Sequence, residues 1–120
     1  MSSDLYTRRG DTVVFSITVT DRTTGGPIDL TGYSIWCTAK SSLSDPDSAA
    51  VFQLTRSSGD IEVTGAENNV IRVTIPAAAT VGFTGNRVLF YDVQIRSPSG
   101  RVTTVVDGKM FVVQDVTRAI

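Results

Sequence analysis

The last third of the chain contains three apolar runs separated by turn-forming residues, at positions 88–96, 101–106 and 109–116. The separator between the second and third runs is Asp107-Gly108. A two-residue Asp-Gly between β-branched runs is a strong hairpin signal, because both central residues of that turn take positive φ. The other separator, at positions 97–100, places Pro and Gly where a longer turn tolerates them. The pattern predicts a three-stranded antiparallel meander.

Alternation between apolar and polar residues continues through the rest of the chain. Residues 12–20 place Phe15 and Ile17 on one face and Ser16 and Thr18 on the other, which is typical of a half-buried strand. After a turn cluster at 21–27, we expect the two apolar residues of segment 28–32 to lie under the fold. Further strands are expected at 33–40, 50–55, 61–64 and 70–75, with a loop at 41–48 and one helical turn near 76–82.

The strand spacing defines the expected fold class. Seven or eight strands, one about every 10 to 15 residues, predict an all-β, two-sheet antiparallel sandwich. A chain of 120 residues is long enough for one domain, spanning 1–120, that buries roughly 65% of the surface of the unfolded chain. We expect the core to contain the residues that alternation turns inward: Phe15, Ile17, Val19, Ile35, Cys37, Ile71, Val73, Ile75, Leu89, Tyr91, Val93 and Ile95.

Charge and hydropathy argue against two classes of partner. The formal net charge is −1 and no run of Lys or Arg is present, so we expect no nucleic-acid partner. The longest apolar stretches are far shorter than the ~20 residues of a membrane span, and we expect no membrane partner. The first four residues lack the basic start and apolar stretch of a signal peptide, which favours synthesis in a cytosol.

The residues offer little catalytic chemistry. The chain has no His, which removes the commonest general base and transition-metal ligand. Its carboxylates lie singly, mainly in turns or on outward faces, where we expect them to be solvated. The pair Asp45 and Asp47 falls short of the oxygen shell of a hard cation. We therefore expect no enzyme activity, no catalytic residue, no cofactor and no metal. The single Cys37 is interpreted as a small buried hydrophobe, with a reactive thiol as the alternative.

The tripeptide Arg9-Gly10-Asp11 spells the integrin-recognition motif. That motif works when a mobile loop tip displays it on an extracellular protein. We instead interpret Gly10-Asp11 as the turn into the strand at 12–20, with Arg9 as its solvated neighbour.

Alternation also turns some large apolar residues outward. If Leu89 and Tyr91 enter the core, then Val88 and Phe90 face outward, and Trp36 does so on its own strand. Near the chain end, Met110 with Val112 and Phe111 with Val113 are both apolar sets, so one set lacks a core to enter. Outward aromatic residues on a rigid sheet are typical interface anchors. Trp36, Val88 and Phe90 are our candidate interface, the alternative being that the termini or the loop at 41–48 cover them.

Several segments together resemble a known family. They are Gly10-Asp11-Thr12, Val19-Thr20-Asp21, the Gly-Gly-Pro turn, the segments 28–32 and 90–95, and the later segments 108–113 and 115–118. This series is similar to the small immunoglobulin-like β-sandwich proteins of tailed bacteriophages, in particular the module at the start of upper baseplate proteins. The resemblance covers almost the whole chain.

The resemblance implies a structural subunit of a virion, in the tail, baseplate or neck, that is assembled in the cytoplasm of the bacterial host. Its partners would be other virion proteins and copies of itself in a symmetric assembly. Two alternatives remain open. A capsid decoration protein would share the fold and the lack of chemistry. A glycan-binding module would need several rings side by side, whereas Tyr33, Trp36, Phe52 and Phe83 fall on separate elements.

Overall fold

Residues 3–114, which the computed structural model describes, form eight β-strands and two single-turn 3₁₀ helices. The all-β prediction and the predicted number of strands are confirmed for this part of the chain. The strands are β1 (Leu5–Arg8), β2 (Val13–Thr18), β3 (Ser34–Lys40), β4 (Phe52–Thr55), β5 (Ile61–Thr64), β6 (Val70–Ile75), β7 (Arg87–Arg96) and β8 (Val102–Val113). The 3₁₀ turns are η1 (Asp47–Ala49) and η2 (Ala77–Ala79), and η2 is the helical turn expected near Pro76.

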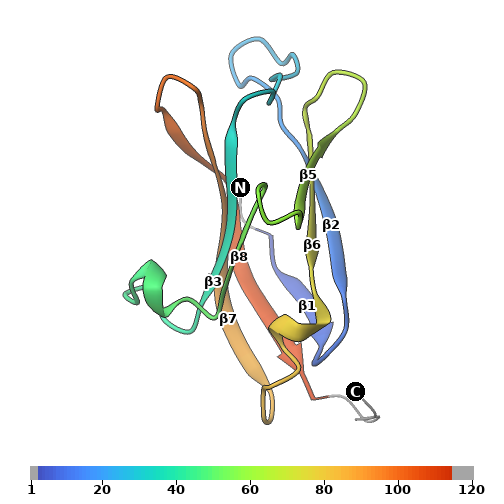
Figure 1. Ribbon diagram of the computed structural model, residues 1–120, viewed down its shortest axis with the longest axis vertical. Coiled ribbons are helices and arrows are strands. Elements are labelled where there is room, and N and C mark those ends of the chain that lie inside the picture. Colours follow the sequence, from blue (N-terminus) through green and yellow to red (C-terminus); the bar gives the residue numbers. More distant parts are fainter. Residues whose placement is uncertain (1–2, 115–120) are drawn as a thin grey trace.

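The strands form two sheets that pack face to face (Figure 1). One sheet has five strands in the order β1-β8-β7-β3-β4, and the other has three in the order β2-β6-β5. All neighbouring strands are antiparallel except β1 and β8, which are parallel. If β2 to β8 are taken as strands B, C, C′, D, E, F and G of an immunoglobulin domain, the two sheets are B-E-D and C′-C-F-G, as in that domain. Strand β1 is added beside the last strand, β8. The fold is therefore an immunoglobulin-like sandwich.

The core lies between the sheets and follows the predicted alternation. Ten of the twelve expected core residues are buried, and Phe15 and Ile17 on β2 are partly buried and packed against the core. These two differ because β2 is an edge strand with a neighbour on one side only. The Phe15 ring still reaches across to Tyr91 on β7, at 6.1 Å between centroids and in edge-on geometry. The buried core residues are Val19, Leu30, Ile35, Cys37, Ala39, Leu54, Ile61, Ile71, Val73, Ile75, Leu89, Tyr91, Val93, Ile95, Val106, Met110 and Val112.

The predicted hairpin at Asp107-Gly108 is wrong. Both residues lie inside β8, which runs without a turn from Val102 to Val113. Because β7 is ten residues long, it pairs with β8 along its whole length, and Asp107 and Gly108 lie opposite Asp92 and Tyr91. Residues 87–113 thus form one long hairpin rather than part of a meander, and positions 115 and 116 of the third predicted run lie outside the described residues. The turn at 97–100 is confirmed, with the Gly100 N–H donating to the Ser97 carbonyl at 2.9 Å.

Gly108 is explained by the N-terminal segment rather than by a turn. A Cβ at this position would collide with the backbone carbonyl of Ser3. The Tyr91 hydroxyl donates a hydrogen bond to that same carbonyl, and the Ser3 N–H donates to the Asp107 carbonyl at 2.7 Å. The missing side chain of Gly108 therefore makes room for the chain to cross β8 just before β1 begins.

Strand β1 was not predicted, and Arg9 is not solvated as we expected. Arg9 is half-buried, and its guanidinium donates to the carbonyl of Val81. Gly10, at φ 80°, forms the predicted turn between β1 and β2, and the Asp11 N–H donates to the Arg8 carbonyl at 3.1 Å. The segment before β3 behaves as predicted, because Leu30 is fully buried and Ile28 packs against the core.

Candidate functional site

The surface of the five-stranded sheet that points away from the core is the candidate functional site, and we call it the outer face. Alternation fixes its composition, because each strand turns every second side chain away from the core. The pairing of the five strands then places these side chains in adjacent rows. The outer face contains Tyr6, Trp36, Thr38, Lys40, Gln53, Thr55, Val88, Phe90, Asp92, Gln94, Asp107, Lys109 and Phe111.

Four aromatic side chains from four strands share this face. Trp36 lies on β3, Phe90 on β7, Phe111 on β8 and Tyr6 on β1. The Tyr6 and Phe111 rings stack across the parallel strand pair, with centroids 4.8 Å apart and planes 9° from parallel. Tyr6 is 73% exposed, whereas Trp36, Phe90 and Phe111 are half-buried. Rings in this setting offer apolar area on a rigid support.

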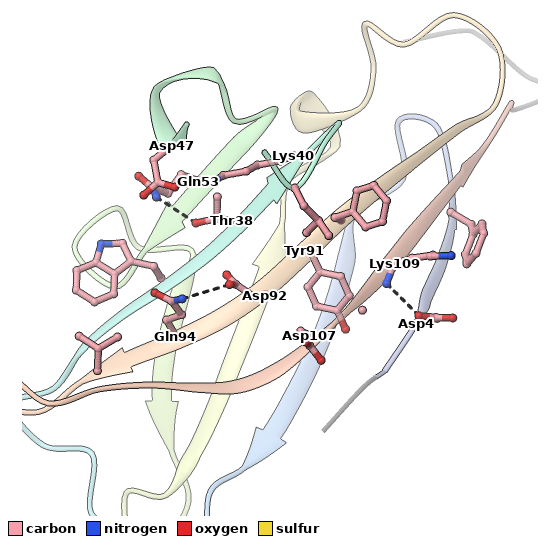
Figure 2. A pocket seen from close by; sticks show the side chains of 16 residues that line it. Asp4, Thr38, Lys40, Asp47, Gln53, Tyr91, Asp92, Gln94, Asp107 and Lys109 are labelled. Carbon is pink, nitrogen blue, oxygen red and sulfur yellow. Dashed lines mark hydrogen bonds and ion pairs between the residues drawn. The ribbon is translucent and has the colours of Figure 1, made fainter. Parts of the chain in front are cut away.

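A hollow of about 970 Å³ lies over β3, β7 and β8 on the outer face (Figure 2). Trp36, Phe90 and Phe111 contribute its rings. Its polar lining includes four carboxylates and two ammonium groups: Asp4, Asp47, Asp92, Asp107, Lys40 and Lys109. The hollow therefore combines aromatic surface with an excess of negative charge.

Asp92 lies on the middle strand, β7, between Thr38 on β3 and Asp107 on β8. Its side chain is half-buried and accepts a hydrogen bond from the amide of Gln94 at 3.3 Å. Burial raises the pKa of Asp92, and the nearby carboxylates of Asp47 and Asp107 raise it further, while Lys40 opposes them. We expected every Asp to be solvated, and Asp92 departs from that expectation because the neighbouring strands enclose it.

The rim beside β4 is held by polar contacts. Lys40 and Asp47 form an ion pair at 2.8 Å that ties β3 to η1. The Lys40 ammonium, by hydrogen bond and charge, lowers the pKa of Asp47. Gln53 on β4 donates to the hydroxyl of Thr38 at 3.1 Å. These contacts fix the wall of the hollow on the side of β4.

The opposite rim is held by the N-terminal segment. The carboxylate of Asp4 accepts the backbone N–H of Lys109 at 2.9 Å, as drawn in Figure 2. Burial raises the pKa of Tyr91, whose hydroxyl is bonded to the Ser3 carbonyl. Both contacts hold the N-terminal segment at this rim, where Asp4 and Asp107 both line the hollow.

The three predicted interface residues all lie on the outer face. Phe90 lies opposite Lys40 on one side and Lys109 on the other, and Trp36 lies opposite Gln94. Both line the hollow, whereas Val88, 46% exposed, lies outside it and opposite Phe111. The structure therefore brings Trp36 and Phe90 to one hollow and leaves Val88 at its edge.

Sequence reasoning missed three residues of this surface: Tyr6, Phe111 and Asp92. The sequence did contain a signal that Phe111 could lie on this surface, because one of the two apolar sets in the last strand had to lie outside the core. Met110 and Val112 are the buried set, so Phe111 and Val113 face outward. Tyr6 could not be assigned, since the segment that holds it was not recognised as a strand.

The described residues offer few other reactive groups. No group of three or more His, Cys, Asp or Glu side chains within residues 3–114 has the arrangement of a metal site. Cys37 is fully buried, and burial raises the pKa of its thiol to about 12. The buried-hydrophobe interpretation of Cys37 is therefore confirmed. Within the same residues, no helix has the length and apolar character that a membrane span requires.

The chain matches no family model and no curated protein. Among solved structures, that of murine CRIg is similar over 95% of this chain and 92% of its own, with 13% sequence identity and a TM-score of 0.38. A likeness of this degree carries no conclusion about function. The assignment of the fold rests on the strand order itself.

Proposed function

We propose that the chain is a non-enzymatic structural subunit of a tailed-phage virion, a component of the tail, baseplate or neck. It acts by binding other virion proteins and copies of itself in a symmetric assembly. The virion part of this proposal rests on the sequence resemblance, which extends over almost the whole chain. The association part rests on the outer face.

The observation that carries the association is the gathering of four aromatic side chains on one sheet face. Trp36, Phe90 and Phe111 are only half-buried, although the core side of each strand is fully packed. Aromatic residues are enriched in protein interfaces, and Trp and Tyr are frequent among the few residues that dominate the binding energy. Their support is rigid, because five paired strands hold them.

The experiment is to locate the chain in purified virions. Particles are banded on a density gradient, washed at high salt and analysed by mass spectrometry and by cryo-electron microscopy. We expect the chain to remain with the particles, in a copy number set by the symmetry of its position. Its presence in the infected-cell lysate but not in washed particles would contradict the proposal.

A glycan-binding role is the second candidate, and the hollow is the observation that favours it. Trp36 with the aromatic side chains at positions 33, 52 and 83 did not predict a platform, but Trp36 lines one cavity together with Phe90 and Phe111, beside amides and carboxylates. A sugar could stack on such rings while its hydroxyls bond to the polar groups. Binding of purified host-surface glycans to the isolated protein, abolished by Trp36→Ala, would favour this role over assembly.

A further inference from the structure

We propose that the hollow on the outer face receives an arginine side chain of a protein partner, with the guanidinium seated over Asp92 between Trp36 and Phe90. This inference rests on the proposed function, because it takes the outer face as the surface that meets a partner. It adds the chemistry of the group that the partner presents.

Charge complementarity is the first argument. Four carboxylates line the hollow against two lysines, so the carboxylates outnumber the ammonium groups. Lys40 is paired with Asp47 at 2.8 Å. Lys109 extends away from Asp92 in Figure 2, toward the rim held by Asp4. The hollow as a whole therefore keeps an excess of negative charge that a cation would offset.

The state of Asp92 is the second argument. Its carboxylate is half-buried, and its hydrogen bond comes from the neutral amide of Gln94 at 3.3 Å. A charged donor makes a shorter and stronger bond to a carboxylate than an amide does. Asp107, directly opposite on β8, adds a second carboxylate within reach of the same cation. A guanidinium has enough N–H groups to bond to both.

The aromatic rings are the third argument, and they favour arginine over lysine. Phe90 lies two residues before Asp92 on β7, and Trp36 lies opposite Gln94, two residues after it. The two rings therefore flank Asp92 on opposite sides along the strand direction. A guanidinium is planar and weakly hydrated and stacks on aromatic faces, whereas an ammonium is a compact, strongly hydrated charge.

The test is a titration of the isolated protein with N-acetyl-arginine amide, followed by ¹H–¹⁵N NMR. We expect saturable shifts at the Trp36 indole N–H and at the backbone amides around Asp92. The citrulline analogue, which has the same shape without the charge, is the matched probe and should produce no saturable shift. Equal shifts with both probes, or none with the arginine probe, would overturn the inference.

Two carboxylate-to-amide variants provide the matched controls. Asp92→Asn should weaken binding of the arginine probe by at least about tenfold, because the charged acceptor is lost. Glu62→Gln changes an exposed carboxylate on β5, in the other sheet, and should leave the affinity unchanged. Unchanged affinity in Asp92→Asn, with its melting curve showing a folded protein, would contradict the inference.

A neutral sugar distinguishes the second candidate function. Saturable shifts of Trp36 with maltotriose but not with the arginine probe would overturn the arginine site and favour glycan binding. The two proposals also fail separately. Arginine binding by a protein that is absent from washed virions would overturn the virion role alone, whereas a virion subunit that does not bind the arginine probe would overturn this inference alone.

Discussion

The two sheets of the sandwich obey the same alternation but present different outward surfaces. The outward residues of the three-stranded sheet are polar apart from two valines, and none is aromatic. They are Val14, Ser16, Thr18, Glu62, Thr64, Val70, Arg72 and Thr74. The outer face of the five-stranded sheet carries Tyr6, Trp36, Phe90 and Phe111 around a half-buried Asp92. Folding requires only that the inward sides be apolar, so it does not account for this difference. The proposed assembly role of the outer face rests on this asymmetry.

The largest expected effect concerns the inward side of β7. Both the assembly role and the glycan-binding role of the outer face assume that this side is packed into the core. Ile95 is 5% exposed and lies opposite Ile35. Ile95→Ala should lower the free energy of unfolding by about 2–5 kcal/mol, because a cavity is left in the core. Val88→Ala on the outward side of the same strand should change it by less than about 1 kcal/mol. Urea denaturation measures both, and equal losses would mean that the faces of β7 are not distinct.

The second effect concerns the N-terminal segment, which forms one rim of the hollow. Gly108→Ala places a methyl group against the Ser3 carbonyl, and the chain must shift away from β8. We expect a loss of about 1–3 kcal/mol in the free energy of unfolding, as for other overpacked sites. Gly82→Ala is the control, because a Cβ there meets open space and its φ is not in the left-handed region. If Gly108→Ala is as stable as Gly82→Ala, this would contradict the close approach of the Ser3 carbonyl to Gly108.

A smaller effect is expected for the stacked ring pair on the outer face. Tyr6→Ala removes the partner of Phe111, whose centroid lies 4.8 Å away. Because Tyr6 is 73% exposed, only the ring contact is lost, and we expect a decrease of about 0.5–1.5 kcal/mol. Hydrogen exchange at the β1–β8 pair should accelerate in this variant, and unchanged exchange would indicate that the stack does not hold β1.

The smallest effect is the pH dependence of Asp92. Burial raises the pKa of Asp92 in the folded protein, so the folded state binds this proton more tightly than the unfolded state does. Its contribution to stability therefore falls as pH rises through the folded pKa, and the charged carboxylate is destabilising at pH 7. Asp92→Asn should be slightly more stable than the parent at pH 7, and the difference should shrink as pH falls to 4. A variant that is less stable than the parent at pH 7 would contradict this account of Asp92.

Local patterns predicted the parts of the fold that depend on one strand at a time. Alternation placed ten of twelve core residues and put Trp36, Val88 and Phe90 on the outward side. It failed where a distant segment decided the structure. Asp107-Gly108 is a residue pair typical of hairpin turns, but its pairing with β7 keeps it extended. Position 108 is a glycine because the backbone of Ser3 lies where a Cβ would be.

The candidate site was only partly predictable for the same reason. That Trp36 and Phe90 share a hollow depends on the antiparallel register of β3 and β7, which no local pattern specifies. Tyr6 joins the face because β1 pairs in parallel with β8, a contact between strands about 100 residues apart in the sequence. The burial of Asp92 likewise follows from its neighbours across the sheet rather than from its own strand.

The central claim, that the outer face is the surface used in assembly, is tested most directly by comparing two substitutions on opposite sheets. Phe90→Asp changes the outer face, and Val14→Asp changes an exposed apolar residue, 50% accessible, on the three-stranded sheet. Both variants should remain folded, because their inward neighbours are untouched.

The measurement is the amount of each variant incorporated into washed virions when it replaces the parent chain. We predict that Phe90→Asp is strongly depleted, since an unpaired carboxylate would be desolvated at the contact, and that Val14→Asp is incorporated normally. Normal incorporation of folded Phe90→Asp would contradict the claim.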